Sequence, residues 1–152
     1  MGRLRRRHSY AELVQLVRSG PPRLSPYRLP GAEAAANTIE FFVHHEDVRR
    51  AQSGSAPRTL EPRLEDVLWA QLNRRAGMMT RRSPVGVVFR RDTGEEVDCR
   101  ARRQANPTQT VTVVGRPSEL VLYAAGRQRV SRVDQFGDED AIAAASTASL
   151  GV

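Results

Sequence analysis

The sequence predicts an α+β fold in which an all-helical part, residues 1–83, precedes a small α+β part, residues 84–152. Two observations predict this division. Before residue 83, apolar residues recur at intervals of three and four, which is the spacing of amphipathic helices. From Pro84 onward, short β-branched runs alternate with turn residues, a pattern typical of strands. The 152 residues suffice for one domain or two small ones.

The helical part contains three predicted helices. The first follows a capping box at Ser9–Glu12 and ends near Gly20. The second spans residues 31–50, where the sequence is rich in alanine and ends in two arginines that suit the carbonyl end of the helix dipole. The third runs from Pro62, a residue tolerated in the first turn of a helix, to Thr80. Its apolar stripe consists of Leu64, Val67, Leu68, Leu72, Ala76 and Met79.

The α+β part alternates strand and helix patterns. A turn at residues 92–94 supplies a glycine where the backbone of a hairpin requires positive φ. Proline at 117 and glycine at 126 mark the start and the end of a short helix. We expect strands over 85–90, 96–102, 110–114 and 130–134, and helices over 117–125 and 138–145.

The composition excludes some classes of protein. No apolar run approaches the roughly 20 residues that a membrane span needs, and no signal peptide opens the chain, so we expect a cytoplasmic protein without membrane contact. The single cysteine, Cys99, cannot form an intramolecular disulfide, and we expect it to be a buried strand residue. The net charge is +7, but all 24 basic residues are arginines scattered along the chain. This distribution favours a solvated exterior over a dedicated nucleic-acid surface.

The helix over residues 31–50 carries a possible metal site. Glu40 and His44 are four residues apart, so their side chains leave the same face one turn apart, and Asp47 continues that stripe. A carboxylate and an imidazole in this relation can bind one divalent metal ion if a third ligand arrives from elsewhere. His45 points about 100° away and is expected to be a surface or packing residue. The alternative reading of Glu40 and His44 is an ordinary polar pair on an exposed helix.

Several stretches together carry a family likeness. The chain resembles the DinB-like metal-binding superfamily, and more closely the mycothiol-dependent maleylpyruvate isomerase family with its uncharacterised relatives. The likeness covers nearly the whole sequence. It rests on SGPP at 19–22, EFFVHHEDVRRAQ at 40–52, LEDVLW at 64–69, PVGVVFRR at 84–91 and GRPSELVLYAAGR at 115–127.

The resemblance implies a fold and a metal site. Residues 1–83 would be a DinB-like four-helix bundle that lacks its first two helices, and residues 84–152 would be a small domain similar to a sterol-carrier-like fold. Zinc would be held by Glu40, His44 and a histidine from an earlier helix, while Asp47 would orient one of these ligands without binding the metal itself. That earlier histidine has no counterpart here. His8 is a conceivable substitute, although it matches no ligand of the family.

The resemblance also implies a chemistry. Arg127 matches an arginine that contacts the substrate, and a mycothiol-like thiol cofactor would bind the metal as a thiolate. The substrate would be a small electrophilic or acidic molecule, and the activity that of an isomerase or a transferase. The bare face of an incomplete bundle could also form a homodimer.

Three functions therefore stay open. The protein could be a divalent-metal-binding protein of the isomerase type, with or without a thiol-dependent activity. It could be a non-catalytic remnant that keeps the fold without the metal. The net charge of +7 leaves a basic nucleic-acid-binding protein as the third possibility.

Overall fold

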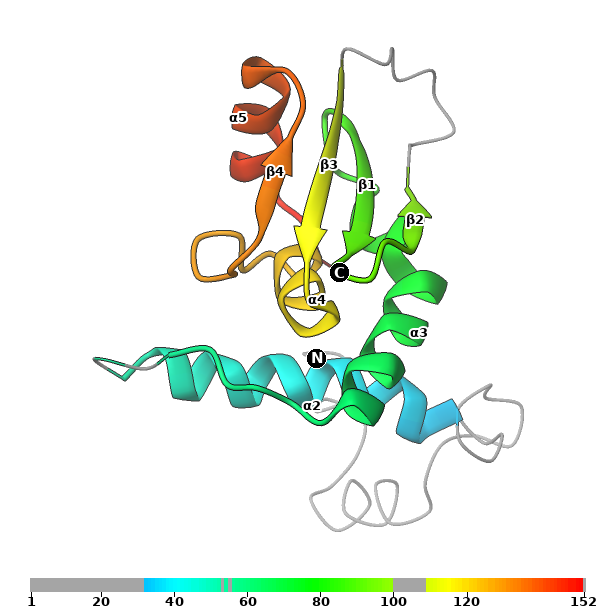
Figure 1. Cartoon of the computed structure of the whole chain (residues 1–152), viewed down its shortest axis with the longest axis vertical. Helices are drawn as coiled ribbons and strands as arrows, with labels where there is room; N and C mark the ends of the chain where they lie inside the picture. Colours follow the sequence, from blue (N-terminus) through cyan, green and yellow to red (C-terminus); the bar gives the residue numbers. More distant parts are fainter. Residues whose placement is uncertain (1–31, 53, 55, 100–108, 152) are drawn as a thin grey trace, which may run out of the picture. The chain divides into compact units, whose positions relative to one another are not determined.

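The computed structural model describes residues 32–52, 54, 56–99 and 109–151. Contacts divide the chain into two units, residues 1–37 and 38–152, and all the elements below lie in the second unit except the first turns of α2. Helices and a sheet are both present, so the predicted α+β class is confirmed (Figure 1). A division into domains at residue 83 stays a prediction, and the helix predicted after Ser9 lies outside the described residues. The elements are α2 (Ala32–Arg50), α3 (Pro62–Met79), β1 (Gly86–Arg91), β2 (Glu96–Asp98), β3 (Thr110–Gly115), α4 (Pro117–Ala124), β4 (Asp134–Phe136) and α5 (Glu139–Thr147).

The four strands form one sheet in the order β2-β1-β3-β4 (Figure 1). The central strands β1 and β3 are parallel, and each outer strand is antiparallel to its neighbour. Val87 and Phe89 of β1 and Val111 and Val113 of β3 are fully buried, while the residues between them are more exposed. This alternation is the period of two that a sheet with one packed face requires.

The last strand lies later in the chain than the sequence predicted. Residues 127–131 form a tight turn instead, in which the amides of Val130 and Ser131 both donate to the carbonyl of Arg127 at 3.1 Å. The prediction of a strand over 130–134 is therefore wrong, and β4 begins at Asp134. The strand predicted over 96–102 is observed as β2 at Glu96–Asp98, and the part beyond residue 99 lies outside the described residues.

Helix α3 packs against α4 with a face rotated from the predicted stripe. Of the predicted apolar stripe, Leu64 and Val67 are 36% and 40% exposed, whereas its other four residues are buried. The buried face instead begins at Glu65, whose carboxylate accepts hydrogen bonds of 2.8 Å from the amide and the hydroxyl of Ser118. These bonds satisfy a free amide in the first turn of α4. The buried residues of α3 are Glu65, Leu68, Trp69, Gln71, Leu72, Ala76 and Met79.

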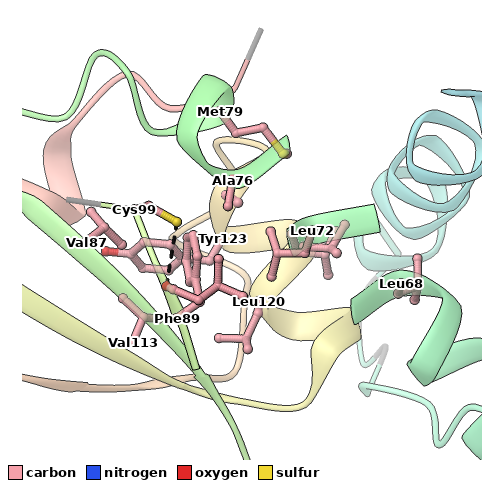
Figure 2. Close-up of a cluster of buried hydrophobic side chains, with 14 of the residues drawn as sticks. Leu68, Leu72, Ala76, Met79, Val87, Phe89, Cys99, Val113, Leu120 and Tyr123 are labelled. Carbon is pink, nitrogen blue, oxygen red and sulfur yellow. Dashed lines mark hydrogen bonds between the residues drawn. The ribbon is translucent and has the colours of Figure 1, made fainter. Parts of the chain in front are cut away.

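The core lies between the sheet and helices α3 and α4 (Figure 2). Every residue of α4 is buried, and the ring of Tyr123 meets that of Phe89 edge to face, with centroids 6.2 Å apart. Cys99 is buried, as expected, and burial raises the pKa of its thiol to about 12. The thiol therefore stays protonated at neutral pH and is a packing group. Within the described part of the chain, no helix has both the length and the apolar character that a bilayer span requires.

Candidate functional site

Helix α2 has one buried and one exposed face. Phe42 and Val43 are buried in the core together with Glu46, whose side chain is only 1% exposed. Glu40 and His44 lie on the exposed side, where 67% of the His44 side chain is accessible. Among the described residues, Glu40 has no hydrogen bond or ion pair, so its carboxylate is available to a ligand. The two predicted metal ligands are thus accessible and one turn apart.

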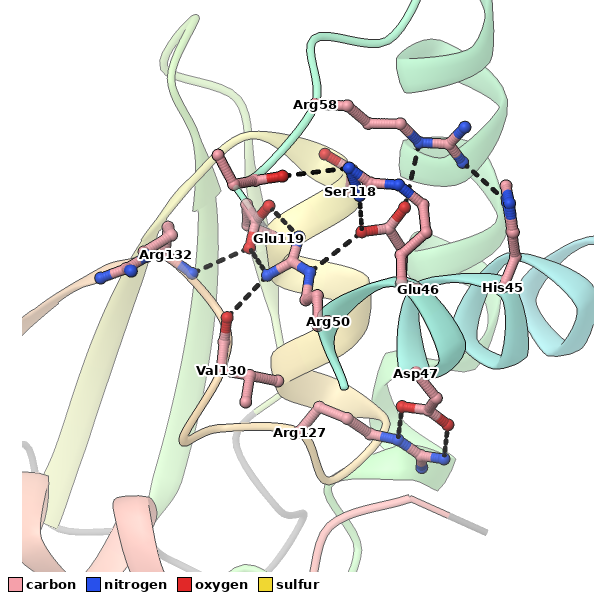
Figure 3. Close-up of polar contacts among 12 residues, drawn as sticks. His45, Glu46, Asp47, Arg50, Arg58, Ser118, Glu119, Arg127, Val130 and Arg132 are labelled. Atoms are coloured by element: carbon pink, nitrogen blue, oxygen red, sulfur yellow. Dashed lines mark hydrogen bonds and ion pairs between the residues drawn. The ribbon is translucent and has the colours of Figure 1, made fainter. Parts of the chain in front are cut away.

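Asp47 joins two other predicted site residues. Arg127 Nη2 donates to Asp47 Oδ2 at 2.7 Å and Arg127 Nε donates to Oδ1 at 3.1 Å, which is the paired geometry of a guanidinium on a carboxylate (Figure 3). His44 Nδ1 lies 3.9 Å from Asp47 Oδ2. His44, Asp47 and Arg127 therefore meet at one place, although Arg127 is 80 residues from Asp47 in the sequence.

The ion pair changes the proton affinity of both partners. Hydrogen bonds from Arg127 outweigh the opposing effect of burial and hold the pKa of Asp47 below its ordinary value of 3.8. The hydrogen bonds to Asp47 likewise raise the pKa of Arg127. Both groups are therefore charged at neutral pH. The substrate contact expected of Arg127 stays a prediction, since this guanidinium is already bonded to Asp47.

The end of α4 places Arg127 where it can reach α2. Gly126 has a φ of 87°, a conformation that glycine adopts without steric cost. Its amide donates to the carbonyl of Tyr123, and the amide of Arg127 donates to that of Leu122. This pair of bonds is a Schellman motif, which ends the helix and turns the chain sharply. The prediction that a glycine at 126 marks the end of this helix is confirmed.

A cavity of about 500 Å³ lies beside the ion pair. The end of α2, the turn after α4 and the C-terminal end of α5 line it. Its charged lining residues are Asp47, Arg50, Arg127 and Arg129, which leave two net positive charges. Val130 and Ala148 contribute apolar surface. The cavity falls within the size range of small-molecule sites, roughly 300–1,000 Å³.

An ion network centred on Arg50 was not predicted from the sequence (Figure 3). Arg50 Nε donates to Glu46 Oε2 at 2.9 Å, and two further nitrogens donate to the carboxylate oxygens of Glu119 at 2.6 and 3.0 Å. Arg50 also donates to the carbonyl of Val130 at 2.6 Å. The side chains of Arg50, Glu46 and Glu119 are 9%, 1% and 7% exposed. The network therefore fixes α2 to α4 and to the turn that lines the cavity.

Several cations compensate the buried carboxylate of Glu46. Burial raises the pKa of Glu46, but the hydrogen bond from Arg50 and the charges of Arg49, Arg50 and Arg58 together lower it. Arg58 Nε lies 3.0 Å from Glu46 Oε1, while its Nη2 contacts the ring of His45 at 3.1 Å. His45 is exposed, as predicted for a residue turned away from the metal stripe. The four-residue spacing of Glu46 and Arg50 was the one available signal for this network.

The described residues supply an incomplete donor set for a metal ion. No group of three or more histidine, cysteine, aspartate or glutamate side chains within them is close enough to bind one ion. Glu40 and His44 are donor types that zinc accepts. His8, the conceivable third ligand, lies outside the described residues.

Acid should remove the stability that the Asp47–Arg127 pair contributes. Since the pKa of Asp47 is lowered in the folded chain, the unfolded chain takes up its proton first as the pH falls. The contribution, about 1 kcal/mol or less for a partly exposed pair, is complete above about pH 5 and is lost as the pH falls through the lowered pKa. Urea unfolding of the parent and of Asp47→Asn checks this. The difference in their unfolding free energies should shrink towards low pH, and a difference that grows would contradict the assignment.

Comparison with protein-family models, with curated proteins and with solved structures finds no match for this chain. The DinB-like likeness therefore stays a prediction from the sequence.

Proposed function

We propose that this protein binds a divalent metal ion, zinc, through Glu40 and His44. The proposal rests on the position and the exposure of these two side chains on α2. They share one side of the helix, both are exposed, and Glu40 is unpaired within the described part of the chain. Exposed donors one turn apart can both reach one ion without breaking an existing bond.

The site needs a third ligand from outside the described residues. Asp47 is a poor candidate because both of its carboxylate oxygens accept hydrogen bonds from Arg127. It is better suited to holding the imidazole of His44 in place, since ligating histidines commonly bond a carboxylate through the other ring nitrogen. The third ligand would be His8 or a side chain of a second copy in a homodimer, the assembly that the family likeness implies.

The proposed activity is that of the mycothiol-dependent maleylpyruvate isomerase type. A bound zinc ion would supply a Lewis acid that lowers the pKa of a mycothiol-like thiol. The chain's own residues would hold the ion with Glu40 and His44 and attract an acidic, electrophilic substrate to the positive cavity. This proposal includes a DinB-like bundle in residues 1–83, a sterol-carrier-like domain in residues 84–152 and a cytoplasmic location, and its thiol chemistry rests on the family likeness alone.

Metal analysis of the purified chain tests the proposal. Plasma mass spectrometry should find about one zinc ion per chain, and His44→Ala should lose it because the imidazole is a ligand. His45→Ala is the matched control, since it removes the neighbouring exposed imidazole from outside the stripe. Equal loss in both histidine variants, or no metal in the parent, would overturn the proposal.

The alternative is a non-catalytic protein that keeps this fold without binding metal. A metal-free parent with the same unfolding free energy as Glu40→Gln would support it.

A further inference from the structure

We propose that the cavity between α2, α5 and the turn after α4 binds a small anionic molecule, and that Arg129 makes the direct contact. This is the cavity to which the proposed function assigns an acidic substrate, but the anion contact requires no metal ion and can be tested apart from metal binding. Three features of the described residues support it: the charge of the lining, the pairing of its arginines and the rigidity of the turn.

The lining of the cavity carries a net positive charge, but its arginines differ in how free they are to bind a ligand. Arg50 is bonded to Glu46, Glu119 and the carbonyl of Val130. Arg127 is bonded to both oxygens of Asp47 and to the carbonyl of Ala125. Arg129 is exposed and has no hydrogen bond or ion pair with any other described residue. Its guanidinium can therefore bind an incoming carboxylate or phosphate without giving up an existing partner.

The turn that carries Arg129 is fixed at both ends. The amides of Val130 and Ser131 donate to the carbonyl of Arg127, and the Ser131 hydroxyl donates to the carbonyl of Gln128 at 3.1 Å. Gln128 Nε2 also donates to the carbonyl of Ala148, just after α5, at 2.8 Å. The backbone of Arg129 is thus held at the cavity by its neighbours, which reduces the entropy lost when a ligand binds.

The remaining lining limits the kind of ligand. Val130 is 44% exposed and, with Ala51 and Ala148, provides apolar contact beside the arginines. A volume of about 500 Å³ accommodates a small molecule and no folded partner. The ligand class is therefore a small carboxylate or phosphate with a short apolar body.

Asp47 opposes anion binding in this arrangement. Its carboxylate lines the same cavity and neutralises Arg127. Asp47→Asn would remove one negative charge and weaken the hold on Arg127, so a second guanidinium would become available to the anion. This substitution should strengthen anion binding, a direction that a purely structural role of the pair would not produce.

Amide NMR titration with succinate and with inorganic phosphate tests the proposal. Succinate or phosphate should shift the amides of residues 126–130 and 147–148 with saturation. Arg129→Gln should weaken that binding about tenfold, since a charge-assisted hydrogen bond is lost. Arg74→Gln, an exposed arginine on α3 outside the cavity, makes the same charge change and should leave binding unaltered. Tighter binding of succinate would identify a carboxylate ligand, and tighter binding of phosphate a phosphorylated one.

Two results would overturn the proposal. One is an equal effect of Arg129→Gln and Arg74→Gln, which would indicate unspecific attraction to a basic chain. The other is a linear, unsaturable shift spread over many arginine-rich segments. The titration is repeated on His44→Ala without metal. If this variant still binds the anion although metal analysis finds no metal in the parent, the proposed metal function fails and the anion site stands.

Discussion

Replacing Arg50 by methionine is expected to lower the free energy of unfolding by about 3–5 kcal/mol. The substitution removes the arginine partner of the buried Glu119 carboxylate and one of the three arginines around Glu46, which keeps Arg49 and Arg58. Both carboxylates are less than a tenth exposed. An unpaired buried charge costs far more than a lost surface contact, because water cannot replace the missing partner. Urea unfolding at neutral pH measures the loss.

An exposed pair supplies the matched control. Arg90 and Glu96 also form an arginine–glutamate pair, but each side chain is 45% exposed. Arg90→Met should cost about 1 kcal/mol or less. If Arg50→Met does not fold, Arg50→Lys keeps the positive charge without the planar fork and should give an intermediate loss. Equal small losses for Arg50→Met and Arg90→Met would show that the network does not fix α2 to α4.

Local signals in the sequence predicted most of the fold. Helix α2 and helix α3 begin and end within a residue of their predicted limits, because proline, glycine and terminal arginines act over a single turn. The strand predicted over 130–134 was wrong for the opposite reason. Val130 and Val133 mimic a strand pattern, but bonds to the Arg127 carbonyl decide the local backbone.

The buried face of α3 depended on a distant residue. Apolar spacing placed Leu64 in the packing stripe of α3, yet its neighbour Glu65 is the buried residue. The Glu65 carboxylate accepts hydrogen bonds from Ser118, which lies 53 positions later in the chain. No periodicity in the sequence contains that information. The same limit applies to Arg50. Its four-residue spacing from Glu46 can be recognised in the sequence, but its hydrogen bonds to Glu119 join residues that are 69 positions apart.

The residues of the candidate site could likewise be predicted only where local spacing determines their positions. Helical geometry alone predicted that Glu40, His44 and Asp47 lie along one stripe of α2. The meeting of Asp47 with Arg127 and the cavity beside them depend on how three separate elements end. The sequence therefore predicted candidate ligands but could not predict the anion site around Arg129.

Gly126→Ala is expected to lower the free energy of unfolding by about 2–4 kcal/mol. Two separate costs contribute. Gly126 has a φ of 87°, where a side chain is strained by about 1–2 kcal/mol. A Cβ atom there would also lie 2.8 Å from the carbonyl oxygen of Leu150, so the backbone of the C-terminal segment must shift. Thermal or urea unfolding measures the total.

Two other glycines separate these costs. Gly94 has a φ of 98° but open space around a Cβ, so Gly94→Ala should show the conformational cost alone, about 1–2 kcal/mol. Gly77 lies inside α3 with open space and no positive φ, so Gly77→Ala should stabilise the chain by about 0.5–1 kcal/mol. Since Gly126 precedes the turn that carries Arg127 and Arg129, its substitution should also weaken anion binding, whereas Gly94→Ala should not. Equal effects of Gly126→Ala and Gly94→Ala on both stability and binding would mean that the Leu150 segment yields freely and does not shape the cavity.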